Sequence, residues 1–222
     1  MDSASVYTSC QNRLLDLAAE LTADQIATPV PALPAWDVRQ TYAHLAGISV
    51  DIGHKGLTPP ADDETTARQV AERAEDDLPT ICDEWRSATP ALLEVLARQT
   101  RARYALPVLD VWHHENDLRG ALGTTPQTEY ADQIADFVLR GLARGWDEAL
   151  PGVRVAATDT GQEWRLGGGD DLALRASAFE LARAVTGRRS IAQITAMDWS
   201  GDPSAVAARL PTLPAPERDL EL

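Results

Sequence analysis

The chain has 222 residues, 44% of them hydrophobic, and its formal net charge is −14. This acidic balance argues against a nucleic-acid partner, because phosphate binding needs a basic surface, and also against anionic membrane surfaces. The sequence lacks an apolar run long enough to span a bilayer, and its first residues lack the basic and apolar regions of a signal peptide. We therefore expect a cytoplasmic protein.

The first part of the chain has the spacing of apolar residues that is typical of helices. The pattern over residues 6–26 predicts one helix, and three prolines between residues 29 and 34 then predict an extended connection. Asp37 is the expected N-cap of a second helix, which ends before Gly56. Helical periodicity continues over residues 78–99, and Pro107 is expected in the first turn of the helix that follows it.

One more amphipathic helix is predicted over residues 128–150, so the first 150 residues are expected to form a bundle with about four long helices. The pattern changes at the Pro151–Gly152 turn. Residues 153–168 predict a β-hairpin, and residues 170–187 predict a helix that ends at Gly187. We therefore expect a helix bundle over residues 1–150 and a small α+β domain over residues 151–222.

The stretch DVWHHENDLRGALG carries most of the polar chemistry of the predicted bundle. Asp110 and His114 are four residues apart, so they share one face of a helix, whereas His113 points about 100° away. The pair can be a weak surface interaction, or it can supply two ligands of one divalent metal, since imidazole nitrogen and carboxylate oxygen both bind zinc.

A three-ligand metal site needs a further group from another helix. His44 lies in the mostly apolar segment TYAHLAG, and this setting by itself favours a buried histidine that is hydrogen-bonded to the protein over a metal ligand. Asp117, three residues after His114, can orient a ligating imidazole or pair with Arg119 or Arg103. Arg119 can be a plain surface residue or an anion clamp.

Four segments together resemble the mycothiol-dependent maleylpyruvate isomerase family. They are TPVPALPAWDVRQTYAHLAG, ERAEDDLPTICDEWRSATPALLEVL, DVWHHENDLRGALG and FELARAVTGRRSIAQITAMDWSGDP, in the order that the family has them. The resemblance implies a DinB-like four-helix bundle followed by a sterol-carrier-like C-terminal domain. It also implies a divalent metal, usually zinc, held by two histidines and one carboxylate, which by position are His44, Asp110 and His114.

The chain departs from the family pattern at two places. Relatives often have Cys-Pro-Gly-Trp where this chain has Leu33-Pro34-Ala35-Trp36, and the isomerases have glutamate at the position of Asp110. Because aspartate is one methylene shorter, either the helix lies closer to the metal or the metal is displaced. The substrate of the isomerases is therefore not carried over to this chain.

The family resemblance implies an isomerase or S-transferase that uses a metal and mycothiol on a small electrophile. Arg119 and Arg188 are the candidate catalytic residues, and Asp117 and Arg189 are the candidate cofactor-binding residues. Arg188 and Arg189 can equally form a basic cluster that ends a helix. A metal-dependent hydrolase and a non-catalytic binder of small molecules remain the alternatives, and a monomer or small homo-oligomer is expected.

Overall fold

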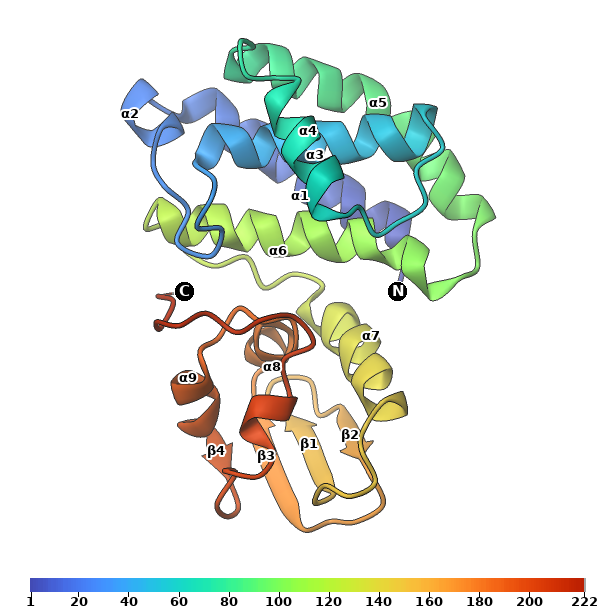
Figure 1. Cartoon of the computed structure of the whole chain (residues 1–222), viewed down its shortest axis with the longest axis vertical. Helices are drawn as coiled ribbons and strands as arrows, with labels where there is room; N and C mark the ends of the chain where they lie inside the picture. The colour runs from blue at the N-terminus through green and yellow to red at the C-terminus, as the bar shows by residue number, and fades with distance from the viewer. Residues whose placement is uncertain (222) are drawn as a thin grey trace. The chain divides into compact units, whose positions relative to one another are not determined.

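The computed structural model describes residues 1–221, coloured along the chain in Figure 1. It divides into two compact units, residues 2–127 and residues 128–221. This division falls earlier in the chain than the Pro151 boundary expected from the sequence. Within residues 1–221, no helix has both the length and the apolar character that crossing a membrane requires.

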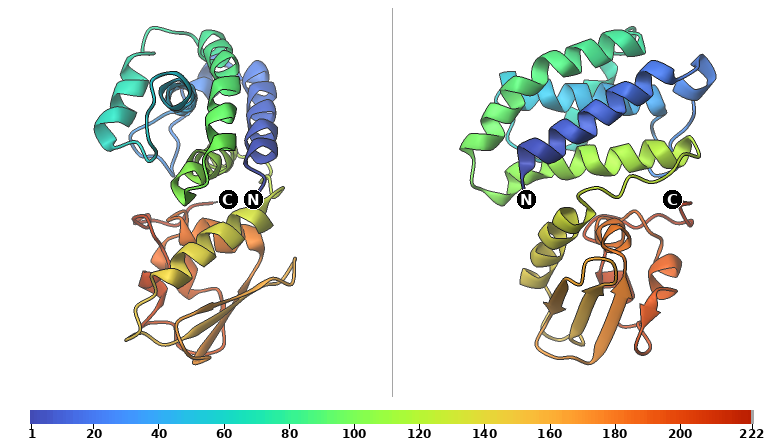
Figure 2. Two further views of the ribbon diagram at one scale, coloured as in Figure 1. Left: turned by 90° about the vertical axis from the view of Figure 1, so that its right-hand side faces the viewer. Right: turned by 180° about the vertical axis from the view of Figure 1, so that it is seen from behind.

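The first unit contains the expected helix bundle. Its long helices are α1 (Ser3–Glu20), α3 (Val38–His54), α5 (Leu78–Arg98) and α6 (Leu106–Ala121), and its shorter ones are α2 (Ala23–Ile26), α4 (Asp63–Ala71) and the 3-10 turn η1 (Ala102–Ala105). Helix α3 packs against α4, α5 and α6, and α1 packs against α5 and α6. The view from behind in Figure 2 shows α1 lying between α5 and α6.

The start of α3 is fixed by a capping box. The Asp37 side chain accepts a hydrogen bond from the Gln40 backbone N–H at 2.7 Å, and the Gln40 side chain accepts one from the Asp37 N–H at 2.9 Å. Two otherwise unpaired backbone donors are satisfied in this way, which confirms the predicted N-cap. A β-bridge between Pro29 and Asp37 also ties the proline-rich loop to the same point.

Buried aromatic side chains hold the bundle together through hydrogen bonds between helices. Trp85 on α5 donates to the Tyr7 hydroxyl of α1 at 2.9 Å, and that hydroxyl lies 2.6 Å from the Ser49 hydroxyl of α3. The Tyr42 hydroxyl of α3 donates to the Leu14 carbonyl of α1 at 2.7 Å. Because buried polar groups are costly when unpaired, these contacts fix how α1, α3 and α5 are rotated relative to one another.

The second unit is a small α+β fold, in agreement with the expected fold class. It contains α7 (Ala131–Arg144), β1 (Val153–Ala157), β2 (Glu163–Leu166), β3 (Leu172–Ala176), α8 (Ala178–Val185), α9 (Ile191–Thr195), β4 (Asp198–Trp199) and η2 (Ala207–Arg209). Its described strands have the order β2-β1-β3-β4. Helix α7 packs against α8 and β2 and buries Ile134, Val138 and Leu139, which explains the earlier division of the chain.

The hairpin β1–β2 is antiparallel, as predicted, but the prediction of one helix over residues 170–187 is wrong. Residues 172–176 form β3, which pairs parallel to β1 and antiparallel to β4. The helix α8 begins only after Ser177, whose side chain accepts from the Glu180 N–H. Gly187 follows the end of this helix with φ +71°, which confirms the predicted C-terminal stop.

Candidate metal centre

Three predicted ligands converge inside the bundle. His44 projects from α3, and Asp110 and His114 project from consecutive turns of α6. The Asp110 carboxylate lies between the two rings, with Oδ2 at 3.0 Å from His44 Nε2 and Oδ1 at 3.1 Å from His114 Nε2. One ligand atom of each residue lies within 4.8 Å of those of the other two. The long-range partner of the α6 pair is thus His44, as the resemblance implied.

Local sequence features position these side chains. The capping box at Asp37 sets where α3 begins, and Pro107 occupies the first turn of α6, three residues before Asp110. Gly47, one turn after His44, lets α4 approach α3, because a Cβ at this position would lie 2.6 Å from the Gln69 Cβ. This close contact brings Gln69 beside the His44 ring.

Each histidine has a hydrogen-bond partner on the side of the ring away from Asp110. His44 Nδ1 lies 2.9 Å from Gln69 Oε1, and His114 Nδ1 lies 3.2 Å from Asp117 Oδ2. The orientation of the Gln69 amide is itself fixed, because its Nε2 donates to Asp51 Oδ2 at 2.7 Å. Both Nδ1 atoms therefore face oxygen acceptors, which places a proton on each Nδ1 and directs each Nε2 toward the centre.

Sequence reasoning identified Asp117 as an orienting group but missed Gln69 and Asp51. Gln69 is fully buried and Asp51 is 2% exposed, which is unusual for such polar residues. Their contact with His44 depends on the packing of α4 against α3. The spacing of residues along one helix does not reveal it.

Charge is concentrated at this centre. Burial opposes ionisation of Asp110, but the charges of His114 and His44 hold the pKa of its carboxyl well below the usual range. Burial also acts to lower the pKa of His114, but Asp110 and Asp117 outweigh it and raise that pKa to about 9. The metal-free centre therefore pairs a carboxylate with a protonated imidazole, and a divalent cation would take the place of that proton.

The donor set fits a divalent metal. Two imidazole nitrogens and a carboxylate oxygen are a known catalytic zinc set. Asp110 contacts His44 Nε2 through Oδ2 and His114 Nε2 through Oδ1, and one ligand atom of each of the three residues lies within 4.8 Å of the other two. The shorter aspartate thus reaches both histidines, and His44, Asp110 and His114 would hold the ion.

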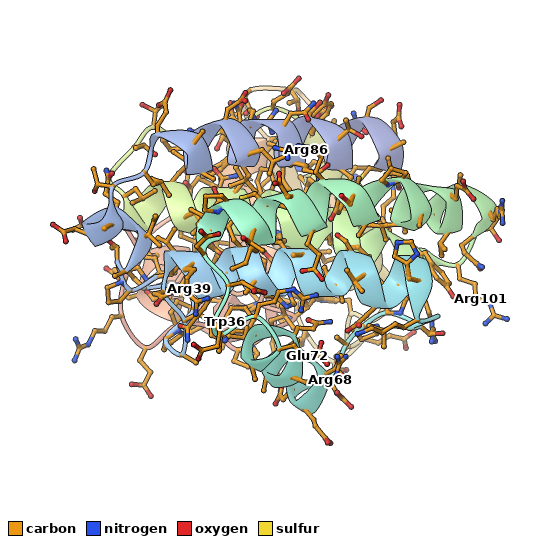
Figure 3. The ribbon with its side chains drawn as sticks, turned by 90° about the horizontal axis from the view of Figure 1, so that it is seen from above. Trp36, Arg39, Arg68, Glu72, Arg86 and Arg101 are labelled. Atoms are coloured by element: carbon orange, nitrogen blue, oxygen red, sulfur yellow. The ribbon has the colours of Figure 1, made fainter. Side chains whose placement is uncertain are left out.

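A cavity of about 220 Å³ adjoins the three ligands. Its other lining residues are Thr66 and apolar side chains that include Leu33, Trp36, Ile48 and Leu106. The Trp36 ring lies 4.9 Å from the His44 ring and 6.3 Å from the His114 ring, measured between centroids. Figure 3 shows Trp36 in the segment that precedes α3. A ligand could therefore reach the centre through an apolar chamber.

Arg119, a candidate catalytic residue, lies elsewhere on α6. Its Nη2 pairs with Glu115 at 3.1 Å, and Glu115 also receives two hydrogen bonds from Arg13, each 2.7 Å long. Glu115 is fully buried, so the two arginines neutralise a carboxylate that would otherwise be costly in the interior. The described residues that line the cavity do not include Arg119.

Arg188 and Arg189 belong to the second unit. Arg189 is 3% exposed and donates to both Glu180 oxygens, at 2.7 and 2.8 Å. Arg188 donates to the Thr186 carbonyl at 3.0 Å. These contacts anchor the end of α8, and the proposed roles of both arginines toward substrate or thiol stay predictions.

Comparisons with known proteins identify the family and the fold of the chain. The family model for the mycothiol maleylpyruvate isomerase N-terminal domain matches residues 7–131, which is more than half of the chain. A crystal structure of a mycothiol-dependent maleylpyruvate isomerase is similar with a TM-score of 0.61 and 12% identity, over 84% of this chain and 88% of that one. The crystal structure of a histidine-to-alanine mutant of a mycothiol-dependent maleylpyruvate isomerase is similar with a TM-score of 0.58, at the same identity and coverage.

At this identity the structural similarity establishes the fold, and no curated protein matches the sequence. The family rests on the match to the N-terminal domain, which contains all three ligands of the centre. The chain belongs to the mycothiol maleylpyruvate isomerase N-terminal domain family.

Proposed function

We propose that the protein is a metal-dependent isomerase or S-transferase that uses mycothiol to act on a small electrophile. The observation that carries this proposal is the meeting of His44, Asp110 and His114 at the cavity, within a family named for mycothiol-dependent chemistry. Zinc is the expected metal, because two imidazoles and a carboxylate suit it. The protein has two free cysteines, Cys10 and Cys82, both buried, and unpaired cysteines are consistent with a cytoplasmic location.

The reaction would start from the thiolate form of mycothiol. A divalent metal, when bound, would favour that form over the neutral thiol. The thiolate sulfur then forms a bond to the electrophilic carbon, and the π electrons of the attacked double bond move onto the conjugated carbonyl. In an isomerase, rotation about the new single bond and expulsion of the thiolate restore the double bond. In a transferase, the adduct takes up the thiol proton and is the product.

The residues of this chain would supply orientation and an apolar environment. Gln69 and Asp117 keep the Nε2 atoms of His44 and His114 directed toward the centre. Trp36 and the neighbouring apolar side chains line the cavity, so a thiolate bound among them would have fewer polar neighbours than in water and be more nucleophilic.

Metal content and thiol binding test the proposal. We expect the purified protein to bind one zinc ion per chain and the His44→Ala variant to lose it. His54→Ala is the matched control, because His54 lies on the same helix but is exposed. Zinc retained by His44→Ala would contradict the metal centre.

Calorimetry with mycothiol then separates the alternatives. The zinc-loaded protein should bind mycothiol, and the zinc-free protein should bind it more weakly. Zinc-dependent ester hydrolysis without mycothiol binding would favour a hydrolase. Absence of both activities in the zinc-loaded protein would favour a non-catalytic binder.

A further inference from the structure

We propose that the cavity at the metal centre accepts a neutral, largely apolar electrophile rather than a dicarboxylate. This inference rests on the proposed function and names the substrate class of the same site. The composition of the cavity wall carries it. Beyond the three ligands, the wall consists of Thr66 and eight apolar residues, and none of its described residues is an arginine or a lysine.

The one hydroxyl group in this wall is already engaged. Thr66 donates its hydroxyl hydrogen to the Asp63 carbonyl of the same helix at 3.0 Å. A substrate carboxylate in the cavity would therefore lose its hydration without gaining a cationic partner from the wall. Burial of an unpaired charge is among the largest costs in protein interiors, whereas an apolar group gains from the same walls.

Two arginines on α3 and α4, the helices that carry His44 and Thr66, are held by other groups. Arg39, near the start of α3, donates to the carbonyls of Arg73 and Asp76 at 2.8 and 3.1 Å. Arg68 on α4 pairs with Asp51 at 2.6 Å and with Glu72 at 2.8 Å. Figure 3 shows Arg68 on α4 beside Glu72, which directly follows that helix, and Arg101 directed outward at the end of the bundle. These cations serve the scaffold or face solvent.

The centre itself would not supply the missing positive charge. The two charges of a divalent cation would be balanced by Asp110 and by the thiolate. The formal net charge of −14 also disfavours the approach of anions over longer distances. A neutral substrate meets neither penalty.

A matched pair of probes tests the proposal. Dimethyl maleate and maleate share one carbon skeleton and differ in charge. For each probe, the rate with zinc-loaded full-length protein and mycothiol is divided by the rate with mycothiol alone, which removes the difference in intrinsic reactivity. We expect a rate enhancement for the neutral ester that exceeds that for the dianion by at least about tenfold. An equal or larger enhancement for maleate would overturn the proposal.

A positive charge introduced into the cavity wall should shift the preference from the neutral ester toward the dianion. Thr66→Arg places a guanidinium at the cavity, and Thr65→Arg makes the same change one residue earlier, at a residue outside the cavity wall. We expect Thr66→Arg to lower the rate enhancement for dimethyl maleate and to raise that for maleate. In Thr65→Arg, both rate enhancements should equal those of the unaltered protein. Equal behaviour of the two variants, with folding checked by circular dichroism, would contradict the assignment of this wall as the substrate site.

Ligand-observed NMR with the metal-free protein keeps this test separate from that of the proposed function. Dimethyl maleate should show saturation transfer that Thr66→Arg weakens, and maleate should show none. If binding follows this pattern but neither probe is turned over with mycothiol, the thiol chemistry fails while the apolar site stands. Binding of maleate in preference to the ester would refute the apolar site whatever the activity.

Discussion

Asp51 fixes the orientation of Gln69. The Gln69 Nε2 donates to Asp51 Oδ2 at 2.7 Å, which leaves Oε1 facing His44 Nδ1 at 2.9 Å. Asp51 is in turn held by Lys55 at 3.1 Å and Arg68 at 2.6 Å. The ion pairs of Asp51 with Lys55 and Arg68, between α3 and α4, therefore determine which nitrogen of His44 is available to a metal.

Replacing Gln69 by leucine should weaken metal binding without removing a ligand. The His44 Nδ1–H would lose its acceptor, and loss of such a partner typically costs about 10- to 100-fold in metal affinity. Competition with a zinc chelator measures this change. Gln99→Leu is the matched control, because Gln99 is exposed at the end of α5. If the two variants bind zinc equally, Gln69 does not orient His44.

Metal binding should release protons near neutral pH. The pKa of His114 in the metal-free protein is raised to about 9, because Asp110 and Asp117 outweigh the effect of burial. At pH 7 this ring is protonated, so an incoming metal must displace at least one proton, and the apparent affinity should fall about tenfold for each pH unit below 9. Calorimetry in buffers of different ionisation enthalpy measures the number of protons. Identical heats in all buffers would show that His114 binds as a neutral ring from the start.

The same pKa also predicts how the metal-free protein responds to alkali. The folded pKa lies above the value of about 6.5 for an unperturbed histidine, so the stabilisation is fully present below pH 6.5 and is lost as the pH rises through about 9. Urea unfolding of the metal-free protein should therefore give a declining free energy of unfolding across this range. A His114→Gln variant should show a smaller decline, and an unchanged decline would assign it to other groups.

A methyl group at Gly47 should disturb the centre through α4 and Gln69. In Gly47→Ala the new Cβ would lie 2.6 Å from the Gln69 Cβ, so α4 must shift. We expect a loss of about 1–3 kcal/mol in the free energy of unfolding together with weaker zinc binding. Gly141→Ala is the control, because a Cβ at that helical glycine meets nothing within 4 Å. This control should gain about 0.5–1 kcal/mol. If Gly47→Ala keeps the free energy of unfolding and the zinc affinity of the unaltered protein, the close contact between α3 and α4 is not needed for either.

Cys82 should react slowly with alkylating agents. Burial raises the pKa of its thiol to about 11, and the thiolate is the reactive form. At pH 8 we expect the native protein to be alkylated at Cys82 roughly 100-fold more slowly than the urea-unfolded chain, with the rate rising toward pH 11. Mass spectrometry of the Cys82 peptide measures this rate separately from that of Cys10. Equal native and unfolded rates at pH 8 would contradict the shielding.

The sequence predicts the bundle well because its helices carry clear signals. The capping residue Asp37, the proline in the first turn of α6 and the spacing of Asp110 and His114 are all local features. The assignment of His44 as their partner rests on the family resemblance, because the local sequence alone favours a buried structural histidine. The packing of α3 against α6 then places the three side chains together.

Features that depend on contacts between elements were harder to predict. Residues 172–176 suit either a helix or a strand, and their pairing with β1 and β4 decides in favour of the strand. Gln69 joins the centre only because Gly47 allows α4 to approach α3. Similarly, α7 buries its apolar face against α8 and β2. The two units therefore divide between residues 127 and 128, before α7, and not at the Pro151 turn.

The position of Asp110 between two imidazoles has a consequence for how a metal would enter the proposed centre. Small zinc modules use the binding energy of the ion to fold, so they unfold when it leaves. Here the carboxylate already draws the α3 and α6 histidines together through contacts of 3.0 and 3.1 Å. Under the proposed function, an ion would therefore enter and leave a folded scaffold, and the available divalent metals would influence which one occupies it.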